Sequence, residues 1–322
     1  MTLKLGVIMD PIDQIKPYKD TTFALMLEAQ ARGHSVHYIE MPWLFLRNGR
    51  AMTLANPVRV RDNNDDWFTL GEQQELSLKG FDIILMRKDP PFDMDYVHST
   101  YLLDMAEKEG VFVVNRPQSL RDCNEKLFAQ EFPQCCPPTL VSCNETLLKS
   151  FINEQQDTIV KPLDGMGGSR IFRVTKDSNN MSVVIEVMTE QGQTQIMVQR
   201  YIPEIVEGDK RIILVNGEPI PYALARIPLS GETRGNLAAG GRGQGRELTD
   251  RDRWICQQVG PELVKRGLYI VGIDVIGDYL TEINVTSPTC IRELDQQFGL
   301  KIAGQVFDAL EQEYAKRKEG IN

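Results

Sequence analysis

The most chemically informative stretch of the sequence is a glycine-rich loop that follows a lysine. In KPLDGMGGS, Lys161 ends an apolar run, and glycines fill three of the four positions 165–168. Such a loop lets backbone N–H groups approach phosphate oxygens without interference from Cβ atoms. It is not a Walker A loop, because no Gly-Lys-Ser/Thr follows and the next residues indicate a strand. An ordinary glycine turn is the alternative. The lysine favours a phosphate site, and Lys126 is a candidate second cation.

A second polar group lies in an apolar segment nearer the C-terminal end, VGIDVIGDYLTEINVTSPT. The pattern predicts two strands around a Gly-Asp turn, with Glu282 and Asn284 on one face because they are two residues apart. Asp274 joins that face if a three-residue turn at 277–279 sets it opposite Glu282, so we predict a bulged turn. Carboxylate and amide oxygens are the ligands that Mg²⁺ prefers. The hairpin therefore predicts a metal site, with a solvated strand face as the alternative.

Residues 226–246, RIPLSGETRGNLAAGGRGQGR, are rich in arginine and glycine and carry almost no large apolar side chain. A disordered loop is one interpretation of this composition. The other is functional, because Arg226, Arg234 and Arg242 concentrate donors suited to phosphate and carboxylate in a protein of negative net charge. The segment then predicts a mobile lid that closes on an anionic intermediate.

The elements that position these groups begin with a βαβ pattern. We expect strands at LKLGVIM, SVHYIE, FDIILM and VFVVN, with helices over residues 20–32 and 96–109 between them, and hence a parallel sheet. Residues 47–75 fit either a hairpin or a long irregular excursion. A new lobe is expected to start near residue 120.

The second half of the sequence predicts a different arrangement. A helix is expected near residues 123–131, and the strand TIVKP then leads into the glycine loop and a further strand, RIFRV. From about residue 196 we expect strands at IMVQRYI, KRIILVN and YALARI, then a helix over 249–266, the acidic hairpin and a terminal helix.

Composition limits the classes of function. The chain has 322 residues, 42% hydrophobic and 25% charged, which suits a globular protein of two or three lobes. A net charge of −9 disfavours nucleic acid as a partner. No apolar stretch is long enough to suggest a membrane span, so a cytoplasmic location is expected. The six cysteines show no C-x-x-C spacing, which predicts reduced thiols.

Five strings together resemble bacterial glutathione synthetases, and the likeness runs nearly end to end: MRKDPPFD, PQSLRDCNEKLF, KPLDGMGG, ARIPLSGETRGNLAAGGRG and LTEINVTSPTCIRE. The resemblance implies an α/β and α+β architecture, in which an N-terminal α/β domain with a parallel sheet precedes an ATP-grasp fold. The expected domains are a substrate-binding domain over 1–122, a lid with the glycine loop over 123–200, and a C-terminal subdomain with the metal site and arginine-rich loop over 201–322.

The activity that the resemblance implies is ATP-dependent joining of γ-glutamylcysteine to glycine, with release of ADP and phosphate. ATP is the co-substrate, Mg²⁺ (Mn²⁺ possible) the cofactor, and a homotetramer the expected assembly. The implied metal ligands are Asp274, Glu282 and Asn284. The implied ATP contacts are Lys126, Lys161, Gly165, Met166, Gly167, Gly168, Gln199, Arg200, Tyr201, Ile202, Asp209 and Arg211. The implied catalytic residues are Arg226 and Arg234, and the implied substrate contacts are Arg87, Gly241, Ser287 and Arg292.

Within these implied contacts, the linker Gln199 to Ile202 would border adenine. Asp209 would take ribose hydroxyls, and Arg211 the phosphate side. Two alternatives stay open: another ATP-grasp ligase acting on a different amino acid or peptide, and a small-molecule kinase on the same scaffold. A nucleotide-binding regulator without turnover is disfavoured by the acidic trio.

Overall fold

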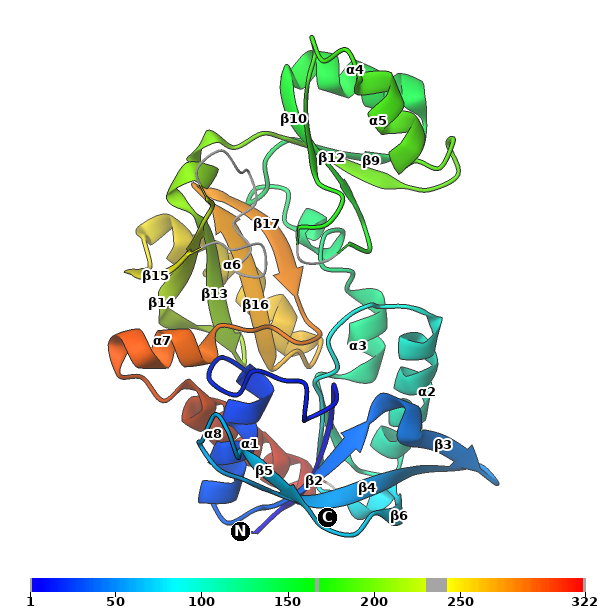
Figure 1. Ribbon diagram of the computed structural model, residues 1–322, viewed down its shortest axis with the longest axis vertical. Coiled ribbons are helices and arrows are strands. Elements are labelled where there is room, and N and C mark those ends of the chain that lie inside the picture. The colour runs from blue at the N-terminus through cyan, green and yellow to red at the C-terminus, as the bar shows by residue number, and fades with distance from the viewer. Residues whose placement is uncertain (1, 166–167, 230–241, 321–322) are drawn as a thin grey trace.

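Three β-sheets follow one another along the long axis of the molecule (Figure 1). The computed structural model describes residues 2–165, 168–229 and 242–320. The first sheet lies at one end with both ends of the described chain, the third sheet lies in the middle, and the second sheet forms a separate lobe at the other end. The chain therefore builds the first and second lobes before it returns to build the middle one.

The first sheet confirms the predicted βαβ pattern. Its parallel strands are β1 (Lys4–Met9), β2 (Ser35–Glu40), β7 (Ile83–Met86) and β8 (Phe112–Val114), in the order β2-β1-β7-β8. The connecting helices are α1 (Thr21–Ala31) and α2 (Met94–Lys108). Asp20 and Asp93 cap them by accepting hydrogen bonds from Phe23 N and Tyr96 N. The loops that follow β1 and β7 lie at the same edge of the sheet, where open α/β folds bind ligands.

Residues 47–75 extend this sheet with antiparallel strands, so the hairpin alternative describes them better than an irregular excursion. The strands are β3 (Leu44–Arg47), β4 (Arg50–Val60), β5 (Phe68–Leu70) and β6 (Gln74–Ser77), and the other three all pair with β4. Short 3₁₀ helices flank them at η1 (Met41–Trp43) and η2 (Leu78–Gly80).

The second sheet is antiparallel, in the order β11-β10-β12-β9. Its strands are β9 (Thr139–Ser142), β10 (Asp157–Pro162), β11 (Phe172–Thr175) and β12 (Ile196–Arg200), and its helices are α4 (Glu145–Gln155) and α5 (Met181–Met188). Leu148 and Ile152 of α4 and Ile185 of α5 pack on Val160 and Val198 in a core of their own. This separate core makes the lobe a compact unit that carries Lys161 at the end of β10.

The third sheet has the order β15-β14-β13-β16-β17, with all neighbours antiparallel. Its strands are β13 (Asp209–Val215), β14 (Glu218–Ile227), β15 (Arg242–Glu247), β16 (Ile270–Ile276) and β17 (Tyr279–Asn284). Helix α6 (Asp250–Lys265) begins with a capping box between Thr249 and Asp252 and packs into the same core as β13 and β16. The short 3₁₀ helix η4 (Pro203–Glu207) links the second sheet to the third.

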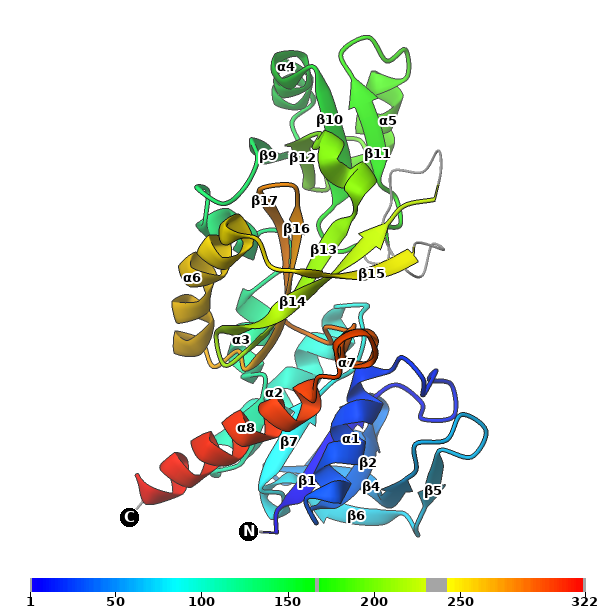
Figure 2. The same cartoon turned by 90° about the vertical axis from the view of Figure 1, so that its left-hand side faces the viewer.

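Two helical expectations need correction. The helix predicted near residues 123–131 is absent: α3 (Pro117–Asp122) ends earlier, and a turn leads into the 3₁₀ helix η3 (Phe128–Glu131). The C-terminal region forms two helices, α7 (Ile291–Phe298) and α8 (Ile302–Glu319), and α8 packs against α1 of the first lobe (Figure 2). No helix in the described part of the chain is long and apolar enough to span a membrane.

Candidate active site

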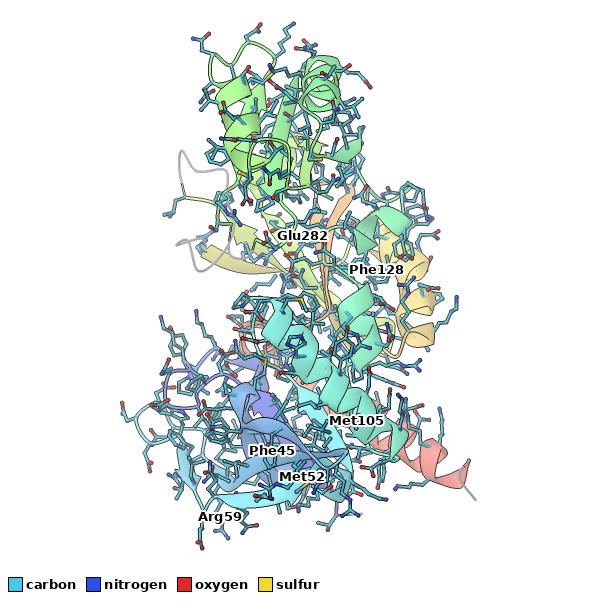
Figure 3. The ribbon with its side chains drawn as sticks, turned by 90° about the vertical axis from the view of Figure 1, so that its right-hand side faces the viewer. Phe45, Met52, Arg59, Met105, Phe128 and Glu282 are labelled. Atoms are coloured by element: carbon cyan, nitrogen blue, oxygen red, sulfur yellow. The ribbon has the colours of Figure 1, made fainter. Side chains whose placement is uncertain are left out.

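A cavity of about 640 Å³ is lined by residues from all three lobes. The first sheet contributes the loops after β1 and β7, the second sheet contributes the ends of β10 and β12, and the third contributes β13, β14, β16 and β17. Glu282, on β17, lies between the upper lobe and the first sheet in Figure 3. Charged groups separated by more than a hundred residues in the sequence therefore share one cavity.

The acidic hairpin pairs in the predicted register, but a different turn produces it. Asp274 lies opposite Glu282, and Gly272 lies opposite Asn284. The predicted three-residue turn is wrong, because Ile276 pairs directly with Tyr279 across a two-residue turn. The register shifts instead inside the strands, between Asp274 and Val275, which leaves one extra residue on β17. That bulge turns the three polar side chains toward the cavity.

Two buried lysines, one at the end of β10 and one in the turn before η3, meet Glu282. Lys161 Nζ lies 3.6 Å from Glu282 Oε1, and Lys126 Nζ lies 3.7 Å from the same oxygen. Lys126 stands in the turn before η3 rather than on a helix, and Nζ also contacts Glu125 and donates to Gly165 O at 2.8 Å. Burial favours the neutral acid, but Lys126 and Lys161 outweigh it and hold the pKa of Glu282 below its usual value. The site thus concentrates cations that suit phosphate oxygens.

Arg211 and Arg226 are held in place by ion pairs with Asp274 and Asp209. Arg211 Nη2 donates to Asp274 Oδ2 at 2.9 Å, and Arg226 Nη2 lies 2.9 Å from the same oxygen. Arg226 also donates to Asp209. Burial opposes ionisation of Asp274, but Arg211 and Arg226 hold its pKa far below the usual range. Burial raises the pKa of Asp209 to about 6, and its buried Oδ1 has no hydrogen-bond partner among the described residues. An unsatisfied buried acceptor is costly, so a ligand donor at that oxygen would stabilise the site.

The hairpin supplies the oxygen ligands that a hard cation prefers. Glu282 and Asp274 present carboxylates. Asn284 Nδ2 donates a hydrogen bond to Asp274 Oδ2 at 3.2 Å, which leaves the amide oxygen of Asn284 as its ligand atom. Among the described residues no group of three or more His, Cys, Asp or Glu is arranged to hold a metal by itself. An oxygen set of two acids and one amide fits Mg²⁺, which completes its shell with water and phosphate.

The end of β12 and the two residues after it border the cavity on the side of the second sheet. All four residues from Gln199 to Ile202 line it. Gln199 Nε2 donates to Thr139 Oγ1 at 3.0 Å, and Arg200 Nη2 donates to Tyr279 OH at 2.8 Å across the lobe boundary. This segment therefore holds a fixed position between the two lobes, as a wall for a planar ligand requires.

Most of the expected site residues converge on this cavity. Gly165, Gly168, Arg87 and Ser287 line it as well. Arg292 does not: its Nη2 bonds Asp62 at 2.6 Å, outside the lining. Four of the expected residues lie outside the described parts of the chain, namely Met166, Gly167, Arg234 and Gly241.

Glu125 is not among the residues that the sequence predicts for the site, although it lines the cavity and contacts Lys126. Burial raises the pKa of this carboxyl, and Glu282 adds to the rise while Lys126 opposes it. The signal was its position directly before a candidate lysine, where a carboxylate can orient the ammonium.

Two family models together match most of the chain. Residues 3–121 match the family described as prokaryotic glutathione synthetase, N-terminal domain, and residues 125–299 match its ATP-grasp domain. Glutathione synthetase of Coxiella burnetii is 57% identical over 98% of both chains. That of Pseudomonas aeruginosa is 56% identical over 98% of this chain and 100% of the relative.

Solved structures give the fold. The D-cycloserine synthetase DcsG superposes with a TM-score of 0.66 at 13% identity, covering 97% of this chain and 99% of that one. An ATP-grasp ligase associated with a ribosomal peptide of Chryseobacterium gregarium gives a TM-score of 0.66 at 15% identity, covering 97% of both chains. At such identities the likeness concerns architecture alone. The full-length matches to curated relatives decide the family, and this chain belongs to the prokaryotic glutathione synthetases.

Proposed function

We propose that this chain makes glutathione by ligating γ-glutamylcysteine to glycine, with ATP cleaved to ADP and phosphate. The observation that carries the proposal is the meeting of Lys126, Lys161 and Glu282 within 3.7 Å in a cavity shared by all three lobes. A carboxylate is a poor electrophile, so phosphoryl transfer to the cysteine carboxylate gives an acyl phosphate, which the amine of glycine then attacks. Phosphate leaves, and the amide bond forms.

The position of each residue in the cavity indicates which part of ATP it would contact. Lys126, Lys161 and the loop at 165–168 hold the phosphates of ATP, and the linker 199–202 borders adenine. Asp209, whose Oδ1 has no partner in the described part of the chain, accepts from ribose hydroxyls, and Arg211 faces the phosphate side. These assignments rest on family membership and on the shared cavity.

Asp274, Glu282 and Asn284 would hold the divalent cation, Mg²⁺ or in its place Mn²⁺. When bound, the cation would neutralise charge on the triphosphate. This chain's own hairpin supplies the oxygen ligands, while Arg211 and Arg226 keep the Asp274 carboxylate ionised. The ligands therefore carry negative charge before the nucleotide arrives.

The arginines stabilise the charge that develops during the reaction. Arg226, held by Asp209 and Asp274, faces the cavity, and Arg234 is proposed to join it at the acyl phosphate and tetrahedral intermediate. Arg87, Gly241, Ser287 and Arg292 are proposed as contacts to the peptide substrate. Of these, Arg292 would have to leave Asp62 to take part.

The assembly and setting belong to the same proposal. We assign domains at 1–122, 123–200 and 201–322, a homotetramer and a cytoplasmic location. The free state of all six cysteines suits a reducing compartment.

The test is ADP release from the purified protein with ATP, Mg²⁺, γ-glutamylcysteine and glycine, each omitted in turn. We expect release only in the complete mixture, with glutathione identified by mass. A stable phosphate ester formed without glycine would favour the kinase alternative. Turnover with another amino acid or peptide and none with this pair would favour a different ligase.

A further inference from the structure

One face of the second sheet continues past the cavity. Lys161 and Ile159 of β10 alternate along the strand and line the cavity, and Asp157 is the next residue on the same face. Arg173 of β11 lies directly opposite Ile159, so its side chain shares that face, and Figure 2 shows the two strands side by side. Among the described residues that line the cavity, neither Asp157 nor Arg173 is found. The face therefore carries a charged pair just outside the site.

Asp157 contacts both Arg173 and the linker 199–202. Its carboxylate accepts hydrogen bonds from Arg173 Nε at 3.0 Å and from Arg173 Nη2 at 2.6 Å. Its backbone oxygen accepts a hydrogen bond from Tyr201 N at 2.9 Å. A planar guanidinium that is held at two points by a carboxylate keeps a fixed orientation. The first residue of β10 thus fixes both the guanidinium and the first residue after β12.

The fixed guanidinium covers one face of the Tyr201 ring. Arg173 Cζ lies 3.8 Å from the ring centroid, well within the separation at which a cation and an aromatic ring attract each other. Tyr201 is half-buried and lines the cavity. Arg173 therefore holds a cavity-lining side chain from a position outside the cavity.

The linker is also fixed on the side of the third sheet. Arg200 Nη2 donates a hydrogen bond to the hydroxyl of Tyr279, the first residue of β17, at 2.8 Å. The linker connects the second lobe to the third, so Arg173 sets its position on one lobe and Tyr279 sets it on the other. A ligand that binds to a surface already in place does not have to order that surface, which favours its binding.

We infer that Arg173 and Asp157 are positioning residues for the nucleotide base, because they hold Tyr201, and through it the linker 199–202, in the place that the base requires. The inference rests on the proposed function, in which this linker borders adenine. Lys161, which is proposed to hold phosphates, lies four residues from Asp157, or about 13 Å along β10. Loss of the pair should therefore weaken binding of the base and leave binding of the phosphates unchanged.

Titration calorimetry with two ligands separates these effects. ADP carries the base and phosphates, whereas inorganic tripolyphosphate carries phosphates alone. We expect Arg173→Ala to raise the Kd of ADP by about 3- to 10-fold, as the loss of an exposed cation–π contact predicts, and to change the Kd of tripolyphosphate less than about 2-fold. In the complete assay the KM of ATP should rise by the same factor as the Kd of ADP, with kcat within about 2-fold of wild type.

Further variants test whether Arg173 acts through the ring. Arg173→Lys keeps a cation but loses the two-point contact, so its Kd for ADP should lie between those of wild type and Arg173→Ala. Asp157→Asn should shift the Kd of ADP in the same direction. In a Tyr201→Leu background, Arg173→Ala should change the Kd of ADP less than about 2-fold, because the ring is already gone. Lys149→Ala removes another ion pair of 2.6 Å on the same lobe, with Glu145 of α4, and is the matched control that should bind both ligands as wild type does.

The results separate the inference from the proposed function. If the wild-type protein binds ADP but does not join γ-glutamylcysteine to glycine, the proposed function fails, while the two titrations still test the pair. Unchanged ADP binding by Arg173→Ala would overturn the inference, and so would equal weakening of ADP and tripolyphosphate, because the pair would then support the lobe as a whole. A full effect of Arg173→Ala in the Tyr201→Leu background would also overturn it. If Arg173→Ala does not fold, Asp157→Asn decides in its place.

Discussion

Replacement of Glu282 by Gln removes the negative charge that two lysines share. Lys161 Nζ and Lys126 Nζ lie 3.6 and 3.7 Å from Glu282 Oε1. At these separations each pair attracts by about 4 kcal/mol with an effective dielectric constant near 20. Desolvation offsets much of this attraction, Lys126 keeps Glu125, and the Glu282 side chain is 22% exposed. We therefore expect the free energy of unfolding of the ligand-free protein to fall by about 1–3 kcal/mol.

The pH dependence of that difference follows from the depressed pKa of Glu282. Its ordinary value is 4.5, and the folded protein holds it lower, so its stabilising contribution is complete above pH 4.5 and disappears as the pH falls through the folded value. The free-energy difference between wild type and Glu282→Gln should be constant from about pH 7 to pH 5 and should shrink below pH 4.5. Urea unfolding at several pH values measures it.

Activity gives the second measurement on the same variant. Because the amide is a weaker cation ligand, ADP release should fall at least about 100-fold, and Mg·ATP should no longer raise the melting temperature. Glu154→Gln, an exposed change on α4, should match wild type in both assays. Unchanged ADP release by Glu282→Gln would show that this carboxylate is not at the reaction centre, and the reasoning would be refuted.

Two further changes test the frame around the site. A Cβ on Gly272 would lie 2.8 Å from Arg211 Cδ and 2.9 Å from Pro288 Cβ, so Gly272→Ala should cost about 1–3 kcal/mol of stability and lower ADP release. Gly80→Ala, where a Cβ meets nothing within 4 Å, is the control, and equal effects would contradict the packing argument. Asn115 makes four buried hydrogen bonds to Tyr269 N, Ile270 N, Ile270 O and Val285 O. Asn115→Ala should lower the free energy of unfolding, measured by urea denaturation, by about 2–4 kcal/mol. A loss below about 1 kcal/mol would show that these four hydrogen bonds are dispensable for stability.

Local pattern was enough to predict the parallel sheet and the face of the acidic hairpin. Alternation fixes which side chains of a strand point together, so Glu282 and Asn284 were placed correctly without any tertiary information. The turn was not predicted correctly, because a three-residue turn and a two-residue turn followed by a bulge both pair Asp274 with Glu282. The extra residue of the bulge is Thr281, which donates to Asp274 O at 3.1 Å. A single neutral residue of this kind does not change the hydrophobic pattern enough to predict a bulge.

Contacts between lobes could not be predicted from the local pattern of the sequence. Helix α8 follows the third sheet in sequence, yet Phe307 and Leu310 pack in the core that contains Phe23 and Met26 of α1. An amphipathic helix shows that it has an apolar face but not which lobe will cover it. The same holds for Lys126, whose turn has no periodicity and is held by Asn124, which accepts hydrogen bonds from Lys126 N and Leu127 N.

A crystal structure with Mg²⁺ and a non-hydrolysable ATP analogue would show directly how the two lysines and the acidic hairpin hold the triphosphate and the cation. We predict phosphate oxygens within hydrogen-bond distance of both Lys126 Nζ and Lys161 Nζ, with the cation on Asp274, Glu282 and Asn284. A nucleotide bound elsewhere, or a triphosphate that touches neither lysine, would contradict it.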